Sequence, residues 1–287
     1  MSQQPQKIVA LVDGSIYSAS VCDHAAWISQ RTGAPVELIH VLGRREATDT
    51  HDHSGAIRLG ARTALLEELA ELDAQRAKLI SHRGRAILED ARAIVDRDGV
   101  TEITTRLRHG DIVESVAEVE ADARVIVIGK RGQAADFAKG HLGSNLERIV
   151  RASHKPVFIA SRAFRPISKV LVAYDGGTSA MKAVDHIARS PLFKGLSVHI
   201  VTVGTATPDV TKGLEDARAM LKAAGIEAET SILPGQPETA LGKLVEEAGF
   251  DMLVMGAYGH SRIRSLIIGS TTTAMIRSCK VPVVLMR

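Results

Sequence analysis

Short apolar segments rich in valine and isoleucine recur along this chain, and each is followed by a longer stretch with helical spacing of its apolar positions. In the C-terminal part, the strand-like segments fall near 169–174, 197–203, 227–233, 251–256 and 282–286. The helical patterns between them fall near 178–190, 210–224, 237–248 and 270–278. Because apolar strands that alternate with helices are typical of a parallel sheet covered on both faces, we predict an α/β fold with a doubly wound, open five-stranded sheet.

The N-terminal part repeats this pattern. Residues 7–15 match residues 169–177 at an offset of 162, and each segment contains Asp-Gly directly after a strand. Residues 124–132 match residues 251–259 at an offset of 127. Self-similarity of this kind indicates two copies of one structural unit. We therefore predict two tandem, Rossmann-like domains, a first at 1–162 and a second at 167–287.

The first copy carries about 35 additional residues, which follow from the difference between the two offsets. They lie in a long helical pattern at about 57–98, where Leu65, Leu69, Leu72 and Leu79 line one stripe. Gly84 is expected to break this helix, because glycine is a poor helix former. We expect the leucine stripe to pack on its own domain, and contact with a partner or with a second copy is the alternative.

Composition and charge exclude several classes of protein. A chain of 287 residues with 45% hydrophobic and 24% charged residues is globular rather than disordered. The net charge of +3, against 36 basic and 33 acidic residues, leaves no basic stripe of the kind that binds nucleic acid. No signal-peptide pattern and no bilayer-spanning apolar run is present, so we expect a soluble, cytoplasmic protein with no membrane contact. Two cysteines fit a reducing compartment, and buried, inert thiols are expected.

Candidate ligand-binding residues follow the predicted strands. Asp13 and Asp175 each end the first strand of their copy and precede a glycine. In open α/β sheets ligands bind beyond the carboxyl ends of the strands, where these carboxylates are expected to lie. The alternative role for each aspartate is an Asx turn that caps the next helix.

A stronger signal follows the fourth strand of the second copy. Gly256 and Gly259 are separated by two residues, and nine residues then precede Gly269, Ser270 and Thr271. The glycines allow a sharp turn and a close ligand, and the start of the next helix offers N–H groups and hydroxyls to an anion. The alternative is an ordinary strand-to-helix loop with a Ser or Thr N-cap.

The spacing Gly256-x2-Gly259-x9-Gly269-Ser270 resembles the nucleotide-binding signature of the universal stress protein family, in its ATP-binding branch. Asp175 and the final Val-Pro-Val-Val strand are also similar to that family, and the match extends over both halves, as in its tandem members. The resemblance implies ATP, with or without Mg²⁺, or a related adenine nucleotide as the ligand, bound between strands one and four. It places Asp175 at the adenine or ribose, the backbone of Val203 beside the adenine, and Gly256 and Gly259 over the ribose and phosphates. Gly269, Ser270 and Thr271 would hold the phosphates.

The first copy keeps most of these positions and departs at one. Its matching positions are Asp13, Val41, Gly129, Gly132, Gly143 and Ser144. Ten residues, rather than nine, separate Gly132 from Gly143. The extra residue adds little to the entropic cost of closing the loop, yet it can displace the N–H groups that would hold phosphate. Asp136 would bring negative charge to this loop, and Lys130, Arg131 and Lys139 would offset it.

Other chemistry is not supported by the sequence. No Walker loop, dinucleotide fingerprint or Gly-x-Ser-x-Gly elbow occurs. No general base stands beside the predicted phosphate site, so we assign no catalytic residue and expect at most slow ATP hydrolysis. His51 and His53 lack the further ligands that would make a metal site, and no metal site is assigned.

These patterns favour a nucleotide-binding stress or regulatory protein. A scaffold without nucleotide and a weak ATPase are the alternatives. The repeat suggests an intramolecular pseudo-dimer. The resemblance implies how it forms, because single domains of the family pair through their last strands, so 155–160 and 281–286 are expected to pair and to cover their edges. A homodimer of the whole chain is a further expectation, with the long helix as one candidate surface.

Overall fold

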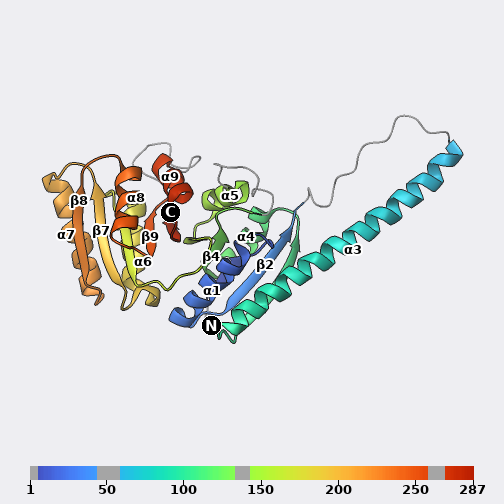
Figure 1. Cartoon of the computed structure of the whole chain (residues 1–287), viewed down its shortest axis with the longest axis horizontal. Helices are drawn as coiled ribbons and strands as arrows, with labels where there is room; N and C mark the ends of the chain where they lie inside the picture. The colour runs from blue at the N-terminus through green and yellow to red at the C-terminus, as the bar shows by residue number, and fades with distance from the viewer. Residues whose placement is uncertain (1–5, 44–58, 133–142, 258–268) are drawn as a thin grey trace.

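The ten strands that the structure describes lie in one continuous sheet (Figure 1). The computed structural model describes residues 6–43, 59–132, 143–257 and 269–287, and the side chains of 59–65 are outside this description. The strand order is β3-β2-β1-β4-β5-β10-β9-β6-β7-β8, so the two halves of the chain form the two halves of the sheet.

The first half alternates strands and helices. Its elements are β1 (Lys7–Leu11), α1 (Ser18–Thr32), β2 (Val36–Leu42), α3 (Leu59–Arg97), β3 (Ile103–His109), α4 (Ile112–Glu120), β4 (Ala123–Gly129), α5 (Ser144–Ala152) and β5 (Val157–Ala160). Each neighbouring pair of strands within this half runs parallel. The predicted doubly wound α/β fold is confirmed, because strand order 3-2-1-4-5 needs crossovers on both faces of the sheet.

The second half repeats this order. Its elements are β6 (Lys169–Ala173), α6 (Thr178–Arg189), the short 3-10 helix η2 (Pro191–Phe193), β7 (Ser197–Val203), α7 (Pro208–Ala223), β8 (Ala228–Leu233), α8 (Pro237–Glu247), β9 (Met252–Gly256), α9 (Ser270–Ser278) and β10 (Val283–Met286). Every one of these strands and the four long helices lies within two residues of its predicted range.

The halves meet where β5 and β10 pair antiparallel. Val283 opposes Ile159, Val284 opposes Phe158 and Leu285 opposes Val157. This pairing is the intramolecular pseudo-dimer that the sequence predicts, and it covers two edges that would otherwise be open to other chains. We call this pair of strands the seam. Because β5 and β10 run in opposite directions, the carboxyl ends of the strands in the two halves point in opposite directions.

The core lies on both faces of the sheet. Along β1, Ile8 and Ala10 belong to the apolar cluster on one face, whereas Val9 and Leu11 belong to the cluster on the other. The first face is covered by α1, α3, α6 and α7, and the second by α4, α5, α8 and α9. Strands buried on both sides therefore need the continuous apolar sequence that these segments have.

Helix α3 corrects one sequence prediction, because Gly84 does not break it. The helix is continuous over 39 residues. A Cβ atom at Gly84 would lie 2.7 Å from Leu107 Cδ1 and 3.0 Å from His40 Cδ2. The glycine is therefore the place where α3 packs closely on β2 and β3.

The leucine stripe of α3 corrects a second prediction, because it does not pack on its own domain. Leu69, Leu72 and Leu79 are 36–70% exposed, whereas Leu88, Ala91 and Val95, farther along the helix, are buried. The side chain of Leu65, the fourth member of the predicted stripe, lies outside the described residues. Figure 1 shows α3 lying along β2 and then extending beyond the sheet toward its N-terminal end. Among the residues that the structure describes, no helix is long and apolar enough to cross a membrane.

Candidate functional site

Asp13 and Asp175 stand at the carboxyl end of the first strand of their half, at the predicted edge. The Asp175 carboxylate accepts a hydrogen bond from Gly177 N at 2.8 Å, and the Asp13 carboxylate accepts one from Ser15 N at 3.0 Å. Each aspartate therefore forms the Asx turn that the sequence offered as its alternative role. The Asp175 side chain is also exposed at this edge, so the turn leaves it accessible to a ligand.

The end of the fourth strand lies against the start of the first helix in both halves. A Cβ atom at Gly129 would lie 2.6 Å from Tyr17 Cβ, and one at Gly256 would lie 2.8 Å from Ser179 Cβ. In the first half, a Cβ atom at Gly132 would lie 2.8 Å from the Asp13 carboxylate. The structure thus brings Asp13, Gly129 and Gly132 together, as predicted, and the glycines permit that closeness.

The Gly-rich loops begin and end with matching hydrogen bonds. Gly143 N donates to Lys130 O, and Gly269 N donates to Ala257 O, each at 3.4 Å. These glycines are the N-caps of α5 and α9, and no side chain caps either helix in the part of the chain that the structure describes. The Ser or Thr N-cap, which the sequence offered as the alternative to an anion site, is therefore absent from these two described helix starts. First-turn N–H groups that no side chain caps can bind an anion.

The hydroxyl residues that follow each N-cap differ in exposure. Ser144 and Ser270 are exposed at the first position of their helices, and Thr271 is half-buried. Thr272, one residue later, is buried and donates to Gly256 O at 3.3 Å. Ser270 and Thr271 thus stand at the open end of α9, while Thr272 fastens that helix to the end of β9.

Val41 and Val203 occupy matching places near the ends of β2 and β7. Val41 pairs with Arg108, Val203 pairs with Leu233, and both valines are half-buried. They lie on the strand next to the one that carries the aspartate, as the resemblance implies for residues beside an adenine. Gly259, Asp136 and Lys139 lie outside the described residues, as do His51 and His53.

Lys130 corrects a third prediction. Instead of balancing charge in the first Gly-rich loop, the buried side chain donates a hydrogen bond to Cys279 O across the seam. Burial lowers the pKa of its ammonium group. This lysine joins the two halves, and the first loop loses one of the cations that was expected to face phosphate.

The remaining candidate residues are structural. Cys22 and Cys279 are buried, and burial raises the pKa of the Cys22 thiol to about 12 and raises that of Cys279. His40 is buried with Nδ1 2.7 Å from Val12 O, and His199 Nε2 lies 2.7 Å from Ser231 Oγ. Within the described ranges, no group of three or more side chains is arranged to hold a metal ion.

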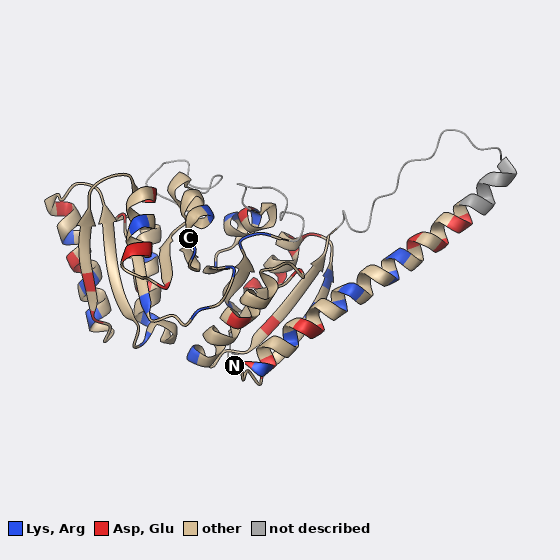
Figure 2. Cartoon of the chain, in the orientation of Figure 1, with Lys and Arg blue, Asp and Glu red and all other residues tan. Residues whose placement is uncertain are grey.

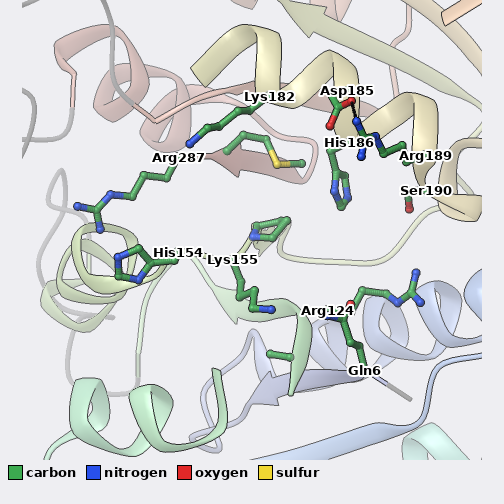
Figure 3. A pocket seen from close by; sticks show the side chains of 13 residues that line it. Gln6, Arg124, His154, Lys155, Lys182, Asp185, His186, Arg189, Ser190 and Arg287 are labelled. Atoms are coloured by element: carbon green, nitrogen blue, oxygen red, sulfur yellow. Dashed lines mark ion pairs between the residues drawn. The ribbon is translucent and has the colours of Figure 1, made fainter. Parts of the chain in front are cut away.

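A second hollow, which the sequence did not predict, lies at the seam between the halves (Figure 3). Its volume is about 380 Å³, and it is lined by the start of β4, the turn before β5, the C-terminal half of α6 and the end of β10. One signal was available in the sequence, because α1 and α6 carry His24 and His186 at the repeat offset of 162. The lining itself depends on which strands pair, and this could not be derived from local patterns.

The fold defines a tandem α/β protein with two doubly wound domains, and in each domain an aspartate follows the first strand and a glycine ends the fourth. The profile of the Universal stress protein family matches residues 5–161 and again residues 166–287, and the chain belongs to this family.

Relatives of the same tandem length support this assignment. The chain is 36% identical over 286 residues to universal stress protein Slr1230 of Synechocystis, covering 98% of this chain and 100% of that protein. It is 24% identical to universal stress protein Rv1996 of Mycobacterium tuberculosis, with 98% and 94% covered. A solved universal stress protein from Archaeoglobus fulgidus has a TM-score of 0.74 at 22% identity, with 99% of each chain covered, and this likeness concerns the fold.

Proposed function

We propose that this universal stress protein binds an adenine nucleotide, ATP with or without Mg²⁺, at the carboxyl edge of its second half. The observation that carries the proposal is the start of α9, where a glycine N-cap leaves the first-turn N–H groups without a side-chain cap and Ser270 is exposed. A helix start of this kind favours phosphate. The complete family spacing from Gly256 to Ser270 supports the same assignment.

Each residue of the proposed site contacts a different part of the nucleotide. Asp175 accepts from the ribose or adenine, the backbone of Val203 lies beside the adenine, and Gly256 and Gly259 pass over the ribose and phosphates. Gly269, Ser270 and Thr271 donate to the phosphate oxygens. These residue types fit the ligand, because small residues let a phosphate approach the backbone and N–H and O–H groups donate to it.

The first half supports nucleotide binding less well. Asp13, Val41, Gly129, Gly132, Gly143 and Ser144 keep the matching places, but the Asp13 carboxylate also accepts from Ser18 Oγ at 3.3 Å. Lys130 is turned toward the seam, and the loop carries one extra residue. We therefore assign the filled site to the second half.

The proposed activity is regulatory rather than catalytic. A nucleotide that binds one conformation better than another shifts the population toward it, and partners can respond to that shift. No side chain among the described residues is assigned as a general base, so hydrolysis is expected to be slow at most. The compartment proposed for this activity is the cytoplasm. The proposal also includes a homodimer of the chain.

The first test is the identity and amount of any small molecule released when the purified protein is denatured, measured by chromatography and mass spectrometry. About one equivalent of ATP per chain supports a filled second site, and two equivalents support both. Protein that releases nothing and fails to bind added ATP with Mg²⁺ in calorimetry indicates a scaffold instead.

The second test is Asp175→Ala, followed by titration with ATP. Loss of a charged hydrogen-bond acceptor at the ligand is expected to weaken binding about tenfold or more. Asp13→Ala is the matched control, since it removes the equivalent aspartate from the first half. Unchanged ATP affinity in Asp175→Ala contradicts the pocket assignment.

A further inference from the structure

The hollow at the seam has a strong positive charge. Five cationic side chains line it, from Arg124, Lys155, Lys182, Arg189 and Arg287. The carboxylate in the lining belongs to Asp185, which pairs with Arg189 at 2.8 Å. Arg287 donates to Arg151 O at 2.7 Å, so its guanidinium is held at the rim. One carboxylate does not balance five cations, so the described lining leaves a surplus of positive charge.

Arg124 lines this hollow and has one hydrogen-bond donor without a partner. Its Nε atom is buried and has no hydrogen-bond partner among the described residues. His186 faces the same space from the other half of the molecule (Figure 3). Burial, with the nearby charge of Arg124, lowers the pKa of His186 to about 4, so the imidazole is neutral near pH 7 and does not add to the charge. A buried donor without an acceptor is uncommon in native proteins and needs an explanation.

The repeat shows why the hollow is open on this side only. His24 on α1 is the equivalent of His186 on α6. The ring of His24 lies 5.0 Å from the ring of Phe164, which belongs to the segment that joins the two halves. His24 is completely buried, whereas His186 is half-buried and borders the hollow. The connecting segment therefore covers one side of the seam, and the described part of the chain leaves the other side uncovered.

We propose that the seam hollow is a binding site for a small, multiply charged, phosphate-bearing anion. The planar guanidinium of Arg124 can bind two oxygens of such a group, while Lys155 and Lys182 approach as point charges from opposite halves. The site is distinct from the proposed nucleotide site, because none of the residues assigned to the nucleotide lines the hollow. Its ligand would contact both halves and bridge them.

The test is calorimetric titration of the full chain with pyrophosphate, repeated with Lys182→Gln and Arg124→Gln. Each variant is expected to weaken binding about tenfold, because each removes a charge-assisted contact. Lys222→Gln, an exposed change on α7, is the matched control and should bind as the native protein does. Lys182 is exposed on α6, so its variant stays informative even where Arg124→Gln fails to fold.

Two further measurements distinguish this site from the nucleotide site. Asp175→Ala is expected to leave pyrophosphate binding intact, and NMR should show the pKa of His186 rising when pyrophosphate binds, because the anion offsets the charge of Arg124. Pyrophosphate affinity that is unchanged in Lys182→Gln, or that follows changes at Ser270 instead, overturns the proposal. The failure of nucleotide binding would leave this result unaffected.

A second inference rests on a different observation. Residues 66–79 of α3 are exposed, and we call this part of the helix the arm. Leu69, Leu72 and Leu79 are spaced by three and seven residues, so they share one stripe of the helix. Leu72 is 55% and Leu79 is 70% exposed. Three exposed leucines on one stripe indicate an interface.

The distribution of charge along the arm favours a second copy of this chain as its partner. Glu67, Glu68, Glu71 and Asp73 make the outer part acidic, and Arg76, Lys78, Arg83 and Arg85 make the following part basic. Figure 2 shows the same division, with red residues toward the far end of α3 and blue residues nearer the sheet. A second copy in antiparallel orientation places acidic against basic at both ends, whereas a parallel copy places like charges together.

We infer that two chains associate through antiparallel pairing of their α3 arms, with the two-fold axis near Gln75. This inference specifies the homodimer included in the proposed function and does not depend on nucleotide. The strands β5 and β10 are already paired within the chain, so their edges are not available for a contact between chains.

The oligomeric state tests this pairing. Light scattering of the native protein is expected to give a dimer, and Leu72→Gln with Leu79→Gln a monomer. Ala74→Gln, on the opposite side of the same exposed helix, is the control and should remain dimeric. A native protein that stays monomeric at high micromolar concentration overturns the inference.

Cysteine cross-linking tests the orientation. Gln75→Cys is expected to form a disulfide between two identical chains, because the residue lies near the axis. Glu67→Cys should cross-link with Arg83→Cys in mixed samples and not with itself. Efficient cross-linking of Glu67→Cys to itself would indicate a parallel pair. The native cysteines do not interfere, because both are buried.

Discussion

His24 and His186 show how one position can serve two purposes. His24 is buried and His186 is half-buried, and for each the loss of solvent is the main cause that lowers its pKa to about 4. His24 is enclosed between Phe158 and Phe164, with Nδ1 2.6 Å from Ser20 O. His186 instead borders the seam hollow. The same residue is thus a packed core group in one half and part of a ligand-accessible wall in the other.

The lowered pKa values predict loss of stability in acid. Histidine in an unfolded chain titrates near 6.5, so between about pH 6.5 and 4 the unfolded state binds more protons than the folded state. The free energy of unfolding should therefore fall as the pH is lowered through this window. Chemical denaturation across the range should show a smaller slope for His186→Gln than for the native protein. An equal slope in both proteins contradicts the assignment.

Gly84 allows a prediction about packing. The Cβ position is occupied by Leu107 and His40 side chains, so Gly84→Val is expected to lower the free energy of unfolding by about 1–3 kcal/mol through overpacking. Gly242→Val in α8 is the matched control, because nothing lies within 4 Å of its Cβ position. The control is expected to be stabilised by a few tenths of a kcal/mol, about the difference in helix propensity. Thermal or chemical denaturation measures both, and equal effects would show that the contact is not important.

At the scale of elements, α3 is one helix with two environments. From Gly84 onward it packs on α1, β2 and β3, whereas 66–79 is exposed along every side chain. An isolated helix of about this length is marginal in water, so the arm depends on contacts that a single chain does not supply.

Hydrogen exchange should reveal this difference. In dilute protein the amides of 66–79 are expected to exchange much faster than those of 88–97, because local opening there breaks few buried contacts. At high concentration the antiparallel pair should protect the arm, while exchange in 88–97 stays unchanged. Mass spectrometry of peptides at two concentrations measures the effect. Protection of the arm that does not vary with concentration contradicts a contact between chains.

The elements also show which features the sequence could predict. The strands and helices of the second half follow from local apolar spacing, and the pairing of β5 with β10 follows from the repeat. The roles of Gly84 and of the leucine stripe were predicted wrongly, because helix spacing does not say which side of a helix meets the sheet. Lys130 was misplaced for a related reason, since its partner Cys279 lies in the other half. Asp13 and Gly132 were placed together correctly, because both follow neighbouring parallel strands.

At the scale of the whole molecule, two kinds of contact hold the halves together. Phe158 and Val284 pair in the centre of the sheet and are almost completely buried. Around them, Arg31 Nε donates to Leu192 O at 2.6 Å, and Lys130 donates to Cys279 O. The connecting segment is therefore only one of several links between the halves.

Cutting the connecting segment should leave the halves associated. Arg162 and Arg165 are exposed, and a specific protease site placed between them in the full chain would allow cleavage after folding. The nicked protein is expected to elute at the volume of the intact protein, because the sheet and the side-chain contacts persist. Separation should need denaturant. Fragments that part in native buffer would show that the connection, rather than the seam, holds the molecule together.

Because the two halves are fused in one chain, the sequence of each half can change independently of the other. In a symmetric pair of separate domains, one gene specifies both sites, so every substitution appears in both. Here each half has its own codons, while the seam keeps the partner present at any expression level. The loop of the first half is one residue longer than that of the second, and Lys130 is turned toward the seam. The continuous sheet therefore allows the two halves to differ in sequence while it keeps them together.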